Sequence, residues 1–399
     1  MRSNQPALTN QSAQPRVGVI GGGQLAGMMA GAAKALGLKL IVQTANATDP
    51  AVAIASQSII AGLDDLQATK KLAAQIDVMT FENEFIDLTA LTPLAAAGLC
   101  FRPCLKTLQP LLDKYKQRTY LQAIGLPVPQ FAALAAGQNP LEFGFSWPVV
   151  IKSRRHGYDG QGTFVIGDAA ALAAFWQRVK LPASEPDQAF LVEEFVPYQQ
   201  ELAVVAARSV TGEIVTYPVV ETQQEQQVCR RVIAPAAISD AIATQIAAIA
   251  QRLLTELDAI GVFGIELFQT ADGKILINEI APRTHNSGHF SLDACPTSQF
   301  EQHLRAICGL PLGDCTLKTA GAVMVNLLGF EQAESSYPDQ QQQLAKLPQT
   351  FVHWYGKTQS HPGRKLGHVT TLLDTADRQA ALDAAQAIEA IWYGDRSRS

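Results

Sequence analysis

Residues 262–289 of the chain read VFGIELFQTADGKILINEIAPRTHNSGH. Two strand-like runs flank Ala271-Asp272-Gly273, a combination that predicts a β-hairpin. With Asp272-Gly273 as a two-residue turn, residue 271 faces 274 and residue 270 faces 275. Counting outward then places Glu266 opposite Glu279, so the hairpin carries two carboxylates on one face of an antiparallel sheet.

This glutamate pair is unfavourable unless something compensates its charge. Opposed carboxylates repel each other, and the apolar neighbours Ile265, Leu267 and Ile280 raise the cost of leaving them unpaired. Mg²⁺ is usually held by two carboxylates together with substrate phosphates, and such a cation would remove the repulsion. The alternatives are an arginine paired with one glutamate, or protonation of one of them. We favour a Mg²⁺ site at Glu266 and Glu279.

A polar loop follows the hairpin directly. It contains Arg283, His285 and Asn286, all within a short reach of the predicted metal site. An arginine can hold a developing anion, and a histidine can donate a hydrogen bond or a proton. A single histidine is more often structural, but this combination beside a carboxylate pair favours a reactive site.

A lysine and a glycine-rich loop occur upstream. Lys152 ends the apolar run 148–152, and residues 156–163 contain three glycines before another strand begins. Backbone N–H groups of such a loop can fold over phosphates, and the lysine adds a point charge. No Gly-Lys-Ser/Thr follows, so this is not a Walker loop. A flexible hairpin with an exposed lysine is the alternative.

Two further segments have weaker signals. The linker 193–196 ends a strand and Glu201 begins the next, an arrangement suited to an adenine edge and ribose hydroxyls or simply to a solvated acidic turn. Gly21-x-Gly23-x-x-Ala26 follows a strand and opens a helix, which favours phosphate binding or a structural tight turn. NAD binding also wants an acid at the end of the second strand, where Gln43 stands.

Composition sets the class of protein. The 399 residues, 47% hydrophobic and 17% charged, suggest two or three globular domains and exclude disorder as the main state. A net charge of −5 without a basic block argues against nucleic-acid and membrane partners. No apolar stretch is long enough to span a bilayer, and residues 1–15 lack the apolar core of a signal peptide. Six cysteines without a Cys-x-x-Cys pair favour reduced thiols in the cytoplasm.

The order of elements predicts an α/β and α+β chain. Strands and helices alternate as far as residue 110, which predicts a doubly wound parallel sheet. Short strands separated by polar turns then predict a central antiparallel sheet, with a long helix over 238–257. The Gln-rich stretch 331–343 is expected to be a loop. We divide the chain into a disordered tail (1–15), an amino-terminal domain (16–110), a central domain (111–316) and a small carboxy-terminal domain (317–399).

Taken in this order, the segments resemble the ATP-grasp superfamily and, within it, the N5-carboxyaminoimidazole ribonucleotide synthetases of purine biosynthesis. The resemblance covers about residues 16–375. Its motifs are Gly21-Gly22-Gly23-Gln24-Leu25, Gly157-Tyr158-Asp159-Gly160-x-Gly162, Asn278-Glu279-x-Ala281-Pro282-Arg283-x-His285-Asn286-Ser287-Gly288-His289 and Pro362-Gly363-Arg364-Lys365-x-Gly367-His368.

The resemblance implies an ATP-grasp fold and a reaction. ATP, bicarbonate and 5-aminoimidazole ribonucleotide give N5-carboxyaminoimidazole ribonucleotide, ADP and phosphate through carboxyphosphate, with Mg²⁺ as cofactor. It also implies a homodimer whose product is used by a mutase.

The resemblance further implies the residue roles. For ATP these are Lys114, Lys152, Gly157, Tyr158, Asp159, Gly160, Gln161, Gly162, Thr163, Glu193, Glu194, Phe195, Val196, Glu201, Gln224, Asn278 and Glu279. For catalysis around bicarbonate they are Asp159, Arg283, His285, Asn286 and Lys357, with Glu266 and Glu279 on the metal. For the aminoimidazole ribonucleotide they are Gly23, Gln24, Leu25, Glu82, Glu84, Tyr158, Asp159, Lys357, Arg364 and Lys365.

Some positions depart from the family pattern. Gln161 stands where a basic residue is frequent, Gln224 where some relatives have histidine, and Ala281 where many ATP-grasp enzymes have asparagine, a role open to Asn278. The rival functions are a formate-using glycinamide ribonucleotide transformylase, a biotin carboxylase, an NAD-dependent dehydrogenase and a non-catalytic nucleotide sensor. The strings at 281–289 and 362–368 argue against the first two.

Overall fold

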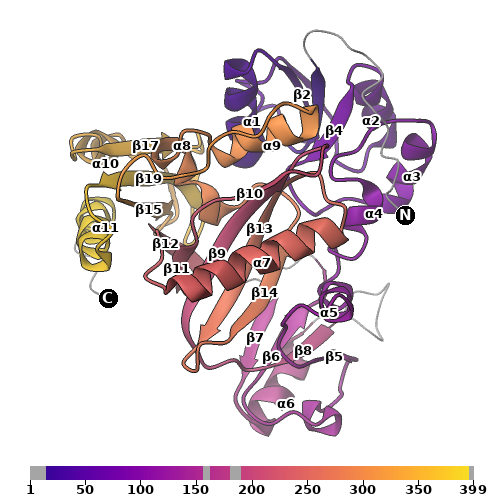
Figure 1. Cartoon of the computed structure of the whole chain (residues 1–399), viewed down its shortest axis with the longest axis vertical. Helices are drawn as coiled ribbons and strands as arrows, with labels where there is room; N and C mark the ends of the chain where they lie inside the picture. Colours follow the sequence, from indigo (N-terminus) through magenta and orange to yellow (C-terminus); the bar gives the residue numbers. More distant parts are fainter. Residues whose placement is uncertain (1–14, 156–161, 180–189, 395–399) are drawn as a thin grey trace.

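The computed structural model describes residues 15–155, 162–179 and 190–394. In Figure 1 the amino-terminal unit lies at one end of the molecule and a small sheet with α5 and α6 at the other. A large sheet crossed by α7 lies between them, and the carboxy-terminal elements flank it on one side.

The amino-terminal unit is a four-stranded parallel sheet in the order β3-β2-β1-β4. This confirms the predicted parallel sheet, although the short strand at 57–60 was not predicted. The strands are β1 (Arg16–Ile20), β2 (Lys39–Thr44), β3 (Gln57–Ile60) and β4 (Val78–Phe81), and the helices are α1 (Gln24–Ala35), α2 (Leu66–Ala73), α3 (Leu88–Ala96) and α4 (Leu105–Leu108).

The small sheet is antiparallel, in the order β5-β8-β6-β7. It carries Lys152 near the end of β6 and the linker 193–196 at the end of β8. Its strands are β5 (Phe131–Leu134), β6 (Val149–Ser153), β7 (Thr163–Ile166) and β8 (Phe190–Glu194), with α5 (Lys114–Ala123), the 3₁₀ helix η1 (Pro140–Phe143) and α6 (Ala169–Arg178).

The large antiparallel sheet runs β14-β13-β9-β11-β12-β15-β19-β17, with β10 paired to β9. Strands from beyond residue 317 therefore continue the central sheet through the β12–β15 pairing. The strands are β9 (Tyr198–Arg208), β10 (Ile214–Thr216), β11 (Val220–Glu225), β12 (Val228–Ala234), β13 (Gly261–Thr270), β14 (Ile275–Ala281), β15 (Gly321–Leu328), β17 (Thr350–Trp354) and β19 (Lys365–Leu373). The helices are α7 (Asp240–Glu256), η2 (Asn286–Gly288), α8 (Ser291–Ala294), α9 (Gln299–Cys308) and α11 (Arg378–Tyr393).

The prediction of a loop over 331–343 is wrong. The segment holds β16 (Ala333–Glu334), which pairs with β18 (Gln359–Ser360), and most of helix α10 (Pro338–Leu344). Pro338 occupies the first turn of α10, where its missing N–H costs nothing, and Asp339 favours the positive end of the helix dipole. Since Leu344 is its one buried residue, this glutamine-rich helix shows almost no apolar periodicity in the sequence.

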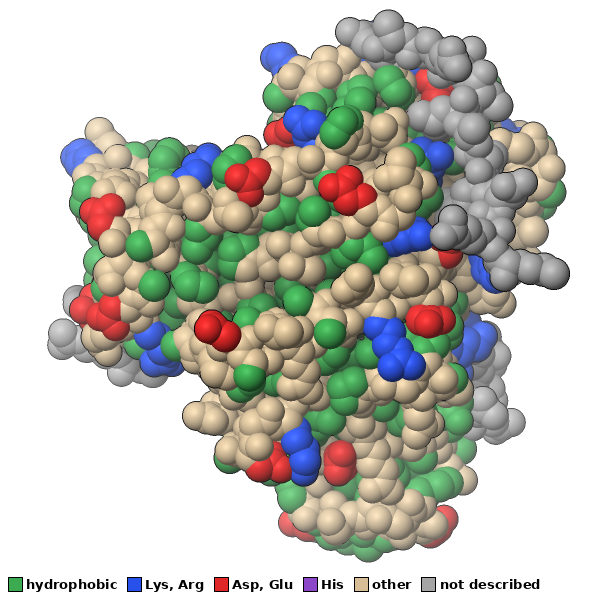
Figure 2. All heavy atoms as spheres, viewed as in Figure 1, with side chains coloured by type: hydrophobic (Ala, Val, Ile, Leu, Met, Phe, Trp, Pro, Cys, Tyr) green, Lys and Arg blue, Asp and Glu red, His purple; other side chains and the backbone are tan. Residues whose placement is uncertain are grey.

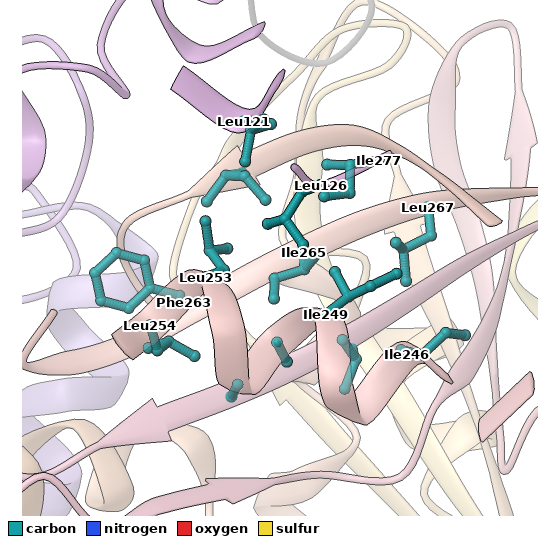
Figure 3. Packing of buried hydrophobic residues seen from close by; sticks show 14 of the residues in the cluster. Leu121, Leu126, Ile246, Ile249, Leu253, Leu254, Phe263, Ile265, Leu267 and Ile277 are labelled. Atoms are coloured by element: carbon teal, nitrogen blue, oxygen red, sulfur yellow. The ribbon is translucent and has the colours of Figure 1, made fainter. Parts of the chain in front are cut away.

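The largest core cluster explains why one face of the hairpin is polar. Ile246, Ile249 and Leu253 of α7 pack against Ile265 and Leu267 of β13 (Figure 3). Successive side chains of a strand point to opposite faces. Glu266, between two core residues, is therefore directed away from α7.

The surface seen in Figure 2 mixes lysine and arginine side chains with aspartate and glutamate over the coloured atoms. In the part of the chain that the structure describes, no helix is long and apolar enough to cross a membrane. All six cysteines lie within the described residues and none forms a disulfide, as expected.

Candidate active site

A cavity of about 1100 Å³ opens between the amino-terminal unit, the small sheet and the hairpin β13–β14. Its size suits a nucleotide together with a small second substrate. Most of the predicted site residues line it, namely Glu84, Lys114, Lys152, Thr163, Glu193, Glu194, Phe195, Val196, Glu201, Gln224, Glu266, Asn278, Glu279, Arg283, His285, Asn286 and Lys365.

The hairpin register confirms that Glu266 lies opposite Glu279, but the predicted two-residue turn is wrong. The turn has three residues, closed by a Thr270 N–H donating to the Lys274 carbonyl at 3.0 Å, and Gly273 takes the left-handed conformation. Gln269 consequently faces Ile275, whereas the predicted register places Thr270 opposite Ile275. A β-bulge at Asn278 restores the register before Glu279.

The bulge brings Asn278 into the cavity beside the glutamates. Its Nδ2 donates to Glu266 at 3.2 Å, and its Oδ1 accepts from Lys152 Nζ at 3.0 Å. Asn278 therefore links one predicted metal ligand to one predicted phosphate-binding lysine.

The two carboxylates differ in charge compensation. Partial burial acts to raise the pKa of Glu279, but Lys114, whose Nζ lies 2.5 Å from Glu279 Oε1, lowers it below its usual value. Burial first, then the charges of Glu279 and Glu201, raise the pKa of Glu266 to about 7. A carboxylate this poorly compensated fits a cation. Among the described residues no group of three or more His, Cys, Asp or Glu could hold a metal, so a cation at this pair needs further ligands from elsewhere, such as phosphate oxygens.

Glu193, predicted at the adenine site, has its carboxylate in a buried network. It accepts from Arg118 Nε and from Lys152 Nζ, the latter at 2.7 Å. Arg118 also donates to the carbonyl of Asn278 at 2.5 Å. Burial alone would raise the pKa of Glu193, but Arg118 and Lys152 lower it to about 2. Glu193 thus fixes the Lys152 side chain at the cavity wall.

Glu193→Gln should lower the free energy of unfolding at pH 7 by about 3–5 kcal/mol, because Arg118 and Lys152 lose their shared carboxylate. The pKa of Glu193 is lower in the folded chain, so its stabilisation is present above pH 4.5 and is lost as the pH falls toward 2. In denaturant titrations, the difference in free energy of unfolding between wild type and variant should become smaller from pH 7 to pH 3. Glu194→Gln, at the exposed neighbour, serves as control. The same difference in free energy of unfolding at every pH would contradict the prediction that Glu193 is ionised in this network.

An aromatic pair in the lining of the cavity suits a nucleoside. Tyr198 and Phe268 stack with ring centroids 4.8 Å apart, and Glu201 interacts with Tyr198 and Gln224. Burial is the main cause that raises the pKa of Glu201 and that raises the pKa of Tyr198 to about 12. The sequence did not single out Tyr198 and Phe268, although both are aromatic residues on strands that line the cavity.

The polar loop after β14 connects the hairpin with the rest of the molecule. Arg283 Nε lies 3.0 Å from Glu84 Oε2 of the amino-terminal unit, and His285 Nε2 lies 3.5 Å from Glu266 Oε1. Asn286 exchanges two amide hydrogen bonds with Asn326 of β15, at 2.9 and 2.7 Å. These contacts bring the loop next to the predicted metal site.

The glycine-rich turn before α1 surrounds a glutamate. Glu82 accepts from the N–H groups of Gly23 at 2.6 Å, Leu25 at 3.1 Å and Ala26 at 3.3 Å. A Cβ at Gly21 or Gly23 would come within 2.5 Å of Glu82, which accounts for both glycines. Burial raises the pKa of Glu82, partly offset by these donors. A ligand phosphate at this turn would meet the Glu82 carboxylate.

The other residues predicted for the ribonucleotide lie where the carboxy-terminal strands approach α1. Lys357 Nζ donates to Gln24 Oε1 at 2.9 Å and to the Lys365 carbonyl at 3.1 Å. Arg364 donates to the Gln359 carbonyl at 2.8 Å. Among described residues, only Glu84 and Lys365 of this predicted set line the cavity itself.

Most of the predicted phosphate loop lies outside the described residues, namely Gly157, Tyr158, Asp159, Gly160 and Gln161. At its end, the Gly162 carbonyl accepts from the N–H of Ser153 at 2.7 Å, and Thr163 pairs with Lys152.

Comparison with known proteins identifies the family. A protein of Synechococcus elongatus named N5-carboxyaminoimidazole ribonucleotide synthase is 54% identical over 383 residues, which cover 94% of this chain and 95% of that protein. The chain belongs to the N5-carboxyaminoimidazole ribonucleotide synthase family. The predicted ATP-grasp fold and family membership are therefore confirmed.

Family models and solved structures agree with this assignment. The ribonucleotide synthetase preATP-grasp domain matches residues 15–109, the ATP-grasp domain 119–300, and the phosphoribosylaminoimidazole carboxylase C-terminal domain 322–382. The synthetase of Thermotoga maritima is 37% identical, with a TM-score of 0.84 over 95% of this chain and 98% of that one. The Aspergillus clavatus synthase in complex with ADP and 5-aminoimidazole ribonucleotide is 29% identical, with a TM-score of 0.85 over 95% and 98%.

Proposed function

We propose that this chain is an ATP-dependent ligase of purine biosynthesis that carboxylates 5-aminoimidazole ribonucleotide. The substrates would be ATP, bicarbonate and the ribonucleotide, and the products N5-carboxyaminoimidazole ribonucleotide, ADP and phosphate. The observation that carries the proposal is the meeting, in one cavity, of Lys114 and Lys152 with the opposed carboxylates and the Arg283-His285-Asn286 loop. The names of the similar proteins support the choice of substrates.

The nucleotide would lie along the cavity wall with its base near Tyr198 and Phe268 and its ribose near Glu201. Lys152, held by Glu193 and Asn278, would direct its charge at the phosphates. Lys114 would bind a phosphate while it pairs with Glu279. Mg²⁺ held by Glu266 and Glu279 would neutralise the phosphate charge that develops during transfer. Phosphoryl transfer depends mainly on such positioning and charge neutralisation.

Carboxylation would proceed in two balanced steps. A bicarbonate oxygen attacks the γ-phosphorus, the bond to the β-phosphate oxygen breaks, and ADP leaves. The exocyclic amine then gains the carboxyl group, directly or by way of CO₂, while phosphate leaves and the amine loses a proton. Arg283, His285 and Asn286 would hold the bicarbonate and the carboxyphosphate, with Lys357 near the ribonucleotide.

Two further proposals rest on family resemblance alone. The chain would work as a homodimer, and its product would pass to a mutase. A location in the cytoplasm is proposed from the pattern of the six cysteines. The domain limits proposed from the sequence, at 110 and 316, are retained.

The decisive experiment follows labelled bicarbonate. With ATP and 5-aminoimidazole ribonucleotide present, we expect ADP and labelled carboxylated product in equal amounts. Omission of bicarbonate should stop ADP release, and formate should not replace it, which distinguishes the formate-using rival. ATP hydrolysis at the same rate without bicarbonate and without the ribonucleotide would refute the proposal.

A further inference from the structure

Strand β14, which carries Glu279, is an edge strand. It pairs with β13 on one side and ends the order of the large sheet on the other. The outer edge of such a strand presents N–H and C=O groups that need partners when they are buried. Here helix α5 and the segment after it supply them.

The side-chain amide of Gln117 in α5 takes the place of a neighbouring strand at the outer edge of β14. Its side chain is buried, its Oε1 accepts from the N–H of Ile280 at 2.9 Å, and its Nε2 donates to the carbonyl of Ile280 at 3.1 Å. One amide thus satisfies both backbone groups of one residue, as a β-bridge would. The same Nε2 lies 3.2 Å from the Leu111 carbonyl, which anchors the amide on the α5 side.

Two further hydrogen bonds satisfy backbone groups along the outer edge of β14. Arg118 donates to the Asn278 carbonyl at 2.5 Å, and the N–H of Ile277 donates to the Pro127 carbonyl at 2.9 Å. Ile277 and Asn278 sit at the bulge, where the regular ladder with β13 is interrupted. An interrupted ladder holds register less well, and a slip of one residue moves each side chain about 3.3 Å along the strand and to the other face.

The helix places these groups by its own periodicity. Lys114, Gln117 and Arg118 stand at i, i+3 and i+4, so they share one helix face. This face contacts three consecutive residues of β14, with Arg118 on residue 278, Lys114 on residue 279 and Gln117 on residue 280. Asp113 fixes the start of the helix, because it accepts from the N–H groups of residues 115 and 116 and pairs with Arg154 at 2.8 Å.

We propose that Gln117 and Arg118 are positioning residues which hold β14 in the register that directs the Glu279 carboxylate at the metal of the bound nucleotide. Neither residue needs to touch ATP, bicarbonate or the ribonucleotide. The inference rests on the proposed function, since it assigns the two residues to the Mg²⁺–nucleotide site of that reaction.

Gln117→Met tests this, because methionine keeps the length and volume but removes both hydrogen-bonding groups. Calorimetric titration with ADP, with and without Mg²⁺, separates nucleotide binding from metal-assisted binding. We expect ADP affinity in EDTA to stay within about twofold of wild type. The gain in affinity on adding Mg²⁺ should shrink by about 10–100-fold, as for other residues that orient metal ligands. Gln122→Met, the same change at an exposed position of the same helix, should leave both affinities unchanged.

Hydrogen exchange of the Ile280 amide in the ligand-free protein gives a second readout. Its N–H bonds to Gln117, so exchange should become faster in Gln117→Met and stay unchanged in Gln122→Met. Arg118→Lys is the second variant should Gln117→Met not fold. Lysine keeps the positive charge beside Glu193 but lacks the second guanidinium nitrogen that donates to the Asn278 carbonyl. This variant should also lose the gain in ADP affinity on adding Mg²⁺ and keep its ADP affinity in EDTA.

The outcomes separate the possible failures. Equal loss of ADP affinity with and without Mg²⁺ would make the contacts purely structural and overturn the inference, as would wild-type values in both variants. If wild type itself gained no affinity from Mg²⁺, the metal-dependent function would fail together with the inference. If the wild type gains ADP affinity from Mg²⁺ and Gln117→Met gains the same amount, the inference is refuted while the proposed function stands.

Discussion

Replacing Glu279 with glutamine should abolish turnover without unfolding the chain. The variant loses one of the two carboxylates proposed to hold the cation that neutralises phosphate charge, an effect worth several kcal/mol. Since each 1.36 kcal/mol is a tenfold change in rate, we expect ADP release to fall by about 1,000-fold or more. The measurement is ADP formation with saturating ATP, bicarbonate and 5-aminoimidazole ribonucleotide.

Stability should change little, because two effects oppose each other. Glutamine gives up the ion pair with Lys114. Because the Glu279 side chain is 41% exposed, this pair contributes about 1 kcal/mol or less. It also removes the repulsion on Glu266, whose pKa is raised to about 7 first by burial and then by Glu279. We therefore expect nearly the same midpoint of thermal unfolding.

The matched control lies on the same hairpin. Asp272 is in the exposed turn, paired with Lys274 at 2.7 Å, and Asp272→Asn should retain wild-type turnover. If Glu279→Gln instead unfolded at a much lower temperature, the carboxylate pair would be a structural element, and the metal site would have to be sought elsewhere.

The predicted pairing of Glu266 with Glu279 is correct because two errors cancel. The turn has three residues instead of the predicted two, and the bulge at Asn278 was not predicted. A two-residue turn places Glu266 opposite Glu279, whereas the actual three-residue turn alone would shift the register by one. The bulge at Asn278 shifts it back. A turn can be inferred from Asp-Gly, but a bulge cannot be read from Asn278, because its stability depends on Lys152, Glu266 and Arg118, which come from other elements.

Residues that act through other residues were missed. Arg118 and Gln117 are polar residues of helix α5, and polar residues at that spacing usually lie on a solvated face. Both are nonetheless buried against β14. The available signal is Lys114, predicted to bind phosphate, together with the Asp113 cap before it, since residues three and four positions beyond a lysine share its helix face.

The glycine-rich turn shows a different limit. Its context was consistent with either phosphate binding or a tight turn, and both readings depend on the same exposed N–H groups. The choice depends on Glu82, which lies 59 residues from Gly23 and reaches it only through the parallel pairing of β1 with β4. Local pattern predicts an anion at the turn, but it does not say whether the anion belongs to a ligand or to the chain.

Replacing Lys357 with methionine should impair use of the ribonucleotide and spare nucleotide binding. Lys357 bridges Gln24 at the start of α1 and the backbone of Lys365, whose side chain lines the cavity. A charge-assisted hydrogen bond to a substrate anion contributes about 1.5–3 kcal/mol. The value of kcat/KM for 5-aminoimidazole ribonucleotide should accordingly fall by about 100-fold.

Two comparisons make this result specific to the ribonucleotide. The ADP dissociation constant should stay at the wild-type value, because Lys114 and Lys152 are the residues proposed to supply the charges at the nucleotide phosphates. Lys346→Met, which removes an exposed charge from the same carboxy-terminal region, should leave kcat/KM unchanged. A variant that first lost ADP affinity would place Lys357 at the nucleotide and would require a different group of residues for the ribonucleotide.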